Sequence, residues 1–158
     1  MVLPSQLKTR VKSVSTFDGE LSEAFAPMAV AITLEDEIDI DRGDMIVKAH
    51  NLPEVSQNFD ATICWLSAKP FDSNSRLILR HTTSKAKCAV EKLFYRIDVN
   101  TLHRVPSPTE LRANDIAKVA IKTSKPLFYD SYRENRLTGC GILIDEVSGA
   151  TVASLVIL

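Results

Sequence analysis

The residues most informative about architecture are 117–123, which read Ala117-Lys118-Val119-Ala120-Ile121-Lys122-Thr123. Polar and apolar side chains alternate along them with a period of two residues. Successive side chains of a β-strand point to opposite faces, so this period predicts a strand rather than a helix.

The same period recurs along most of the chain. It marks residues 10–15, 29–34, 45–49, 61–66, 76–81, 86–93, 93–99, 141–145 and 151–157. The run at 29–34 is apolar enough to predict a strand buried on both faces. Short strands separated by turn signals, such as Asp18-Gly19, are typical of a sandwich or barrel.

Helical periodicity is almost missing from the sequence. The two candidates, residues 21–25 and 107–111, are short, and Pro27 ends the first. Neither could carry the crossover between two parallel strands, so the sheets must be mainly antiparallel. The sequence therefore predicts an all-β protein.

Composition sets the broad class. The chain has 158 residues, 45% of them apolar, and a formal net charge of −1. These values are typical of a globular protein without a net positive charge that would attract nucleic acid or anionic lipid. No apolar run reaches the length of a membrane helix, and the first residues lack the pattern of a signal peptide. We therefore expect a cytoplasmic protein with neither membrane nor nucleic acid as partner.

A boundary is expected near Asn51-Leu52-Pro53, because proline removes a backbone donor and suits a linker. Residues 1–53 offer three or four strands, too few to close a barrel. Residues 54–158 suffice for a barrel of six or seven strands. We therefore predict one incomplete and one complete antiparallel barrel, with unpaired edges in the first that favour a homodimer or strand exchange.

No residue is predicted to be catalytic, to bind a cofactor or to bind a metal. Cys64, Cys88 and Cys140 are odd in number and far apart, which favours small buried side chains over a disulfide framework or a zinc site. The five glycines form no phosphate-binding loop. Trp65, the only tryptophan, is interpreted as a core or interface anchor.

Residues 35–44 form an acid-rich segment that ends in Arg42-Gly43-Asp44. Their spacing excludes the calcium loop of an EF-hand, which requires a glycine and a glutamate at other positions. We interpret the segment as a solvated hairpin turn whose carboxylates protect an edge. Arg42 and Asp44 are retained as candidate partner contacts.

Residues 130–139 are the densest polar segment, Asp130-Ser131-Tyr132-Arg133-Glu134-Asn135-Arg136-Leu137-Thr138-Gly139. Arg133 and Arg136 could bind a phosphate or a partner's carboxylate, with Asn135 beside them. The alternative is a purely structural loop, in which the arginines pair with Asp130 or Glu134 and Gly139 is left-handed.

Several of these segments together resemble a known family. They are residues 16–19, 36–44, 64–66, 98–102 and 130–139, in this order. They are similar to the GTPase subunit of bacterial sulfate adenylyltransferase, including versions fused to adenylylsulfate kinase. More distant similarity is to translation GTPases of the elongation factor Tu type.

The resemblance implies which parts are present. It implies that residues 1–53 end the second, translation-factor-like barrel and that residues 54–158 form the third. The GTP and Mg²⁺ sites would belong to a preceding domain, and adenylyl transfer to a smaller partner subunit. This chain would then be a docking and coupling platform within a longer protein, inactive by itself. We expect contacts with both the smaller subunit and the GTP-binding domain.

Two other functions stay open. A translation-factor-type barrel could bind RNA or an aminoacyl end, although dispersed cations and 6% aromatic residues argue against such a surface. A stand-alone β interaction module is the third interpretation.

Overall fold

The segments that alternate in the sequence form β-strands in the computed structural model, which describes all 158 residues. No residue is helical, so the all-β prediction is confirmed and both short helical candidates lie in irregular segments. The chain accordingly contains no helix able to cross a membrane. It divides into unit 1, Met1–Leu52, and unit 2, Pro53–Leu158.

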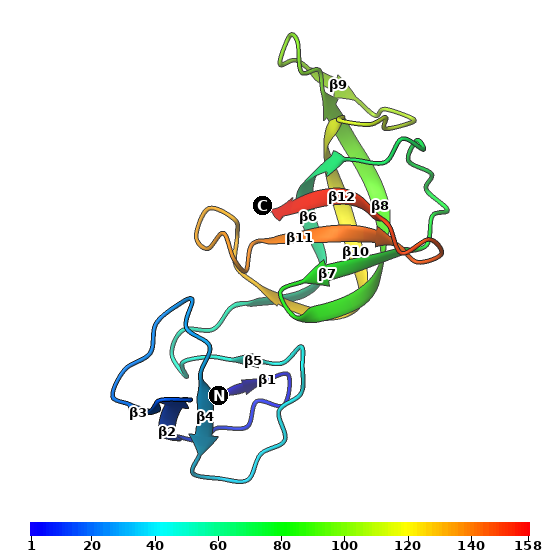
Figure 1. Cartoon of the computed structure of the whole chain (residues 1–158). Helices are drawn as coiled ribbons and strands as arrows, with labels where there is room; N and C mark the ends of the chain where they lie inside the picture. The colour runs from blue at the N-terminus through cyan, green and yellow to red at the C-terminus, as the bar shows by residue number, and fades with distance from the viewer. The chain divides into compact units, whose positions relative to one another are not determined.

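Unit 2 is a closed antiparallel barrel with one additional strand (Figure 1). Its strands are β6 (Glu54–Trp65), β7 (Leu77–His81), β8 (Ser84–Ile97), β9 (Arg104–Pro106), β10 (Ile116–Tyr129), β11 (Cys140–Asp145) and β12 (Thr151–Ile157). The ring runs β10-β6-β12-β11-β7-β8 and closes because β8 also pairs with β10. The predicted complete barrel is confirmed, and β9 extends from the free side of β8.

The two-residue period of β10 explains how the barrel fills. Ala117, Val119 and Ile121 are at most 1% exposed, whereas the alternate Lys118 and Lys122 face outward. Inward residues of the other strands complete one core. Trp65 is part of it: its indole donates to the Lys69 carbonyl at 2.9 Å and meets Phe71 edge-on, as the anchor interpretation predicted.

Strand β8 is longer than the sequence indicated. The runs at 86–93 and 93–99 join into one strand of 14 residues. Two register irregularities against β10 let it continue while changing which side chains face inward. A two-residue period shifts phase at such a bulge, so a continuous strand resembles two separate ones in the sequence.

Unit 1 consists of two small sheets, with no closed barrel. Strands β1 (Val2–Leu3) and β5 (Met45–Ile46) form one, and β2 (Val11–Thr16) lies between β3 (Gly19–Leu21) and β4 (Ala31–Leu34) in the other. The incomplete unit is therefore as predicted. Only Val2 and Leu3 are buried hydrophobic residues there.

Two expectations about unit 1 were wrong. The segment 29–34 is largely exposed, with Ile32 43% accessible, because β4 is an edge strand with β2 as its single neighbour. Residues 35–44 are no hairpin turn, since β4 pairs with β2 while β5 pairs with β1. They connect the two sheets of the unit, with every carboxylate except that of Asp44 exposed.

Candidate functional site

The loop at residues 130–139, between β10 and β11, is held together by its own polar side chains. Asp130 Oδ2 accepts a hydrogen bond from the Thr138 hydroxyl at 2.5 Å and one from the Asn135 amide at 3.3 Å. Asn135 Oδ1 in turn accepts from the Leu137 backbone N–H at 3.1 Å. One half-buried carboxylate thereby joins the beginning of the loop to its end.

Backbone contacts anchor the same loop to the barrel. The Tyr132 N–H donates to the Ile157 carbonyl at 3.0 Å, and the Ile157 N–H donates to the Gly139 carbonyl at 2.8 Å. Strand β12 is thus bonded to both ends of the loop. This arrangement makes the loop a rigid part of unit 2.

A glycine is required at position 139 because the backbone of the same loop passes very close to it. The expected reason, a left-handed conformation, was wrong. The φ of Gly139 is not positive. A Cβ at this position would lie 2.4 Å from the Tyr132 Cα and 2.8 Å from the Asn135 carbonyl oxygen. Any side chain here would collide with backbone that cannot move independently.

The structural alternative for the two arginines was also wrong. None of the five ion pairs in the structure includes Arg133 or Arg136. Asp130 is occupied by Thr138 and Asn135, and Glu134 accepts the Ser131 hydroxyl at 3.1 Å. Arg136 instead lies 5.9 Å from the centre of the Tyr132 ring. The loop therefore presents two exposed guanidinium groups without carboxylate partners.

Exposed apolar side chains accompany these cations. Leu137 is 76% accessible and Tyr132 is 36% accessible. Arginine and tyrosine beside an exposed aliphatic group are the residue types enriched where proteins bind one another. With Arg133 and Arg136 they form the exposed surface of residues 130–139, which we name the docking loop after the role proposed for it below.

His81 supports the docking loop from below, a role that the sequence did not reveal. It ends β7, is 1% exposed, and its Nε2 donates to the Thr138 carbonyl at 2.6 Å. Burial lowers its pKa below the usual 6.5, more than the Thr138 carbonyl and the Asp130 carboxylate raise it. Only the pairing of β7 with β11 makes this contact possible, because 57 residues separate the partners.

The other two candidate residues, Arg42 and Asp44, belong to unit 1. They flank Gly43, whose φ of 112° suits glycine, and Asp44 Oδ2 accepts from the Asp41 N–H at 3.1 Å. Arg42 is exposed and makes no ion pair. The turn is thus a locally bonded element of unit 1, whereas the docking loop belongs to unit 2.

The three cysteines form no disulfide. Cys64, Cys88 and Cys140 are free and half-buried rather than buried as expected, since Cys64 lies on the outward side of β6. Burial raises the pKa of the Cys88 thiol to about 12, which suppresses its thiolate. No group of three or more His, Cys, Asp or Glu side chains is placed to hold a metal ion.

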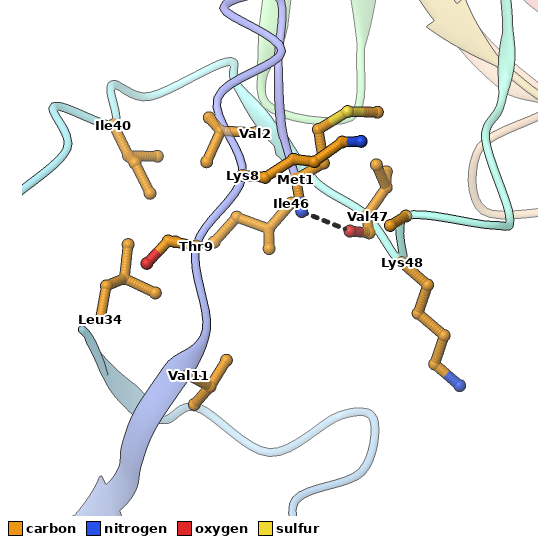
Figure 2. A pocket seen from close by; sticks show the side chains of 11 residues that line it. Met1, Val2, Lys8, Thr9, Val11, Leu34, Ile40, Ile46, Val47 and Lys48 are labelled. Carbon is orange, nitrogen blue, oxygen red and sulfur yellow. Dashed lines mark hydrogen bonds between the residues drawn. The ribbon is translucent and has the colours of Figure 1, made fainter. Parts of the chain in front are cut away.

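Unit 1 contains a cavity of about 350 Å³ (Figure 2). Apolar side chains from both sheets line it, among them Val11, Leu34 and Ile46, together with Ile40 of the segment between the sheets. Lys8 and Thr9 also line it. The Met1 amino group donates to the Val47 carbonyl at 2.9 Å beside it. The hydrophobic residues of unit 1 thus surround an open space rather than fill a core.

Comparison with known families gives a match over most of unit 2. The sequence model described as GTP-eEF1A C-terminal domain-like matches residues 58–158. The solved structures of sup35 complexed with GDP and with GMPPNP resemble the whole chain, each with a TM-score of 0.87. They share 17% sequence identity with it, and the chain covers 39% of each. That likeness establishes the fold alone.

Curated relatives match nearly the whole sequence. A bifunctional enzyme CysN/CysC of Rhodopirellula baltica is 46% identical over 99% of this chain, which spans 24% of that protein. Sulfate adenylyltransferase subunit 1 of Bacteroides fragilis is 44% identical over 97%, spanning 32%. CysN/CysC of Mycobacterium tuberculosis H37Rv is 42% identical over 100%, spanning 26%. The resemblance read from the sequence is confirmed, and the chain spans about a quarter to a third of these relatives.

Proposed function

This chain belongs to the GTP-eEF1A C-terminal domain-like family, and from that premise we propose that it forms the barrel portion of a sulfate adenylyltransferase large subunit. The parent activity would make adenosine 5′-phosphosulfate from ATP and sulfate, coupled to GTP hydrolysis. The observation that carries the proposal is the 46% identity with CysN/CysC over 157 residues.

In this proposal the two units have different origins within the parent. Residues 1–53 are the C-terminal part of the second barrel, and residues 54–158 are the third barrel. The open cavity of unit 1 supports this assignment, because its apolar lining needs cover that the rest of a barrel would supply. Unit 2 already has a closed core.

The function of this portion is docking and coupling rather than chemistry. GTP and Mg²⁺ would bind to the parent's GTP-binding domain, and adenylyl transfer would take place on a smaller subunit. The docking loop would contact that subunit through Arg133 and Arg136, which have no carboxylate of their own. Rigid loops transmit displacement well, so its anchoring to β12 suits a coupling element.

The remaining partners and the location belong to the same proposal. The relatives named subunit 1 support a second subunit, and the CysN/CysC names support a fusion with a kinase in some parents. Three free thiols suit a reducing compartment, which favours the cytoplasm. A homodimer through the strand edges of unit 1 remains a prediction.

Binding of the smaller subunit from the same genome tests the proposal. The purified chain should bind it and should itself neither hydrolyse GTP nor form adenosine 5′-phosphosulfate. The double variant R133E/R136E should weaken binding about tenfold or more. K85E/K125E reverses as many exposed charges elsewhere on the barrel and is the matched control. Activity of the chain alone, or equal binding by both variants, would contradict the proposal.

A further inference from the structure

The hairpin that joins β8 to β9 projects beyond the end of the barrel (Figure 1). Asp98 shapes its tip: Oδ1 accepts hydrogen bonds from the Asn100 and Thr101 N–H groups at 2.9 and 3.1 Å. The Asp98 carbonyl also accepts from the Leu102 N–H at 2.7 Å. These bonds close the turn through the side chain and carbonyl of one residue, Asp98.

Leu102 occupies an unfavourable place in this tip. Its φ is 58°, in the left-handed region, where the Cβ of an L-residue has an energetic cost. Its side chain is nevertheless 78% exposed, so no burial within the chain offsets that cost. Val99, across the turn, is 58% exposed. A glycine or asparagine would satisfy the backbone better, so the leucine is best explained by a contact outside this chain.

Cations and aromatic rings follow the tip along the hairpin. Arg104 lies 4.7 Å from the Tyr95 ring centre, and Phe94 has Lys92 at 4.9 Å and Lys118 at 5.2 Å. Lys118 pairs with Asp60, whereas Lys92 and Arg104 make no ion pair. Strand pairing thus brings together cations that lie far apart in the sequence.

The tip contains one carboxylate, that of Asp98, and it stays ionised. Asp98 is committed to two backbone N–H groups, which hold its pKa below the usual range. At the base of the hairpin, Arg96 Nη1 bonds both oxygens of Asp115 at 3.2 and 3.3 Å and ties the hairpin to the segment before β10. The result is a tip that exposes two apolar side chains, Val99 and Leu102, with cations on its flanks.

We infer that this tip, formed by Val99, Leu102 and Arg104, is a second contact for the smaller subunit, seated in an apolar pocket edged by carboxylates. The inference rests on the proposed function and adds a surface to the docking loop. A pocket of that chemistry would bury Leu102 and pair with Arg104, whose stacking on Tyr95 limits its freedom before binding. Because both rings already lie beneath cations, the surface favours a protein's carboxylates over stacked bases.

The substitution L102N separates this contact from a role in folding. Asparagine tolerates the left-handed conformation, so the melting temperature should stay equal or rise. Affinity for the smaller subunit, measured by calorimetry with the 158-residue chain, should fall about tenfold. R104E should weaken binding at least as much. The matched control V147N changes a valine that is 84% exposed in another turn and should leave affinity unchanged.

The possible outcomes distinguish the inference from the proposed function. If the wild-type chain binds the subunit and L102N binds equally well, this contact is wrong while the proposed function stands. If the wild-type chain does not bind the subunit at all, the proposed function is wrong, and the inference that rests on it is wrong as well. Retention of tRNA that R104E abolishes, or self-association that L102N abolishes, would assign the tip to RNA or to a second copy and overturn the inference.

Discussion

Unit 2 and unit 1 contain similar kinds of strands but very different interiors. Eighteen of the twenty buried hydrophobic residues belong to unit 2, and two, Val2 and Leu3, belong to unit 1. The difference follows from closure: a ring of six strands gives every inward side chain neighbours on all sides, whereas two small sheets leave theirs around a cavity. Alternation alone therefore makes strands, and closure makes a stable core.

The two units also differ in charge. Unit 1 has five Lys and Arg against nine Asp and Glu, and unit 2 has fourteen against eleven. The net value of −1 for the whole chain conceals this asymmetry. The excess of cations is on the unit that also presents the docking loop, which favours an acidic partner for that unit.

Separating the two units should give the largest effect. Residues 53–158 expressed alone should fold cooperatively, because their core is complete within that range. Residues 1–52 alone should remain largely unfolded, since two buried side chains cannot offset the chain entropy. Amide proton dispersion in NMR spectra measures both. A well-dispersed spectrum for residues 1–52 would show that closure is dispensable.

Matched truncations should repeat the contrast at single residues. L143A removes a side chain that is fully buried in the barrel and should lower the free energy of unfolding by about 2–5 kcal/mol. I46A removes one that is 49% exposed in unit 1 and should cost less than about 1 kcal/mol. Denaturant unfolding of the whole chain gives both values. Equal losses would mean that unit 1 has a core of its own.

Adding a methyl group at Gly139 tests whether the docking loop can shift. G139A places a Cβ within 3 Å of the Tyr132 backbone and should destabilise unit 2 by about 2–3 kcal/mol while weakening binding of the smaller subunit. The control G149A meets no atom within 4 Å and bears only the strain of its φ of 73°, about 1 kcal/mol. Thermal unfolding ranks the two. A harmless G139A would show that the loop can shift.

The smallest effect should be a pH dependence of unit 2. Folded His81 has a pKa below 6.5, so under about pH 6.5 the unfolded chain binds the proton that the folded chain excludes. Lowering the pH below about 6.5 should therefore lower the free energy of unfolding, by up to about 1.4 kcal/mol per pH unit, until the pKa of folded His81 is reached. H81Q should lack this contribution. An identical slope in both proteins would assign the dependence to other groups.

The local sequence pattern was sufficient to predict the strands, the lack of helices and the family. The period at 117–123 is enough because side-chain direction in a strand depends only on backbone geometry, and β10 contains that segment. Trp65, the only tryptophan, was likewise identifiable as an anchor from its residue type. The docking loop was recognised as polar and structured, since its turn-forming residues act on nearby backbone.

Tertiary structure alone determined which side chains contact one another. Sequence could not show that Asp130 would be taken by Thr138 and Asn135, leaving Arg133 and Arg136 free, or that His81 would meet Thr138. The sequence could not show that Lys92 and Lys118 would both lie against the Phe94 ring, or that Leu102 would be exposed at the tip of a hairpin. Such contacts depend on register between distant strands, and register is determined by closure of the whole barrel rather than by any segment within it.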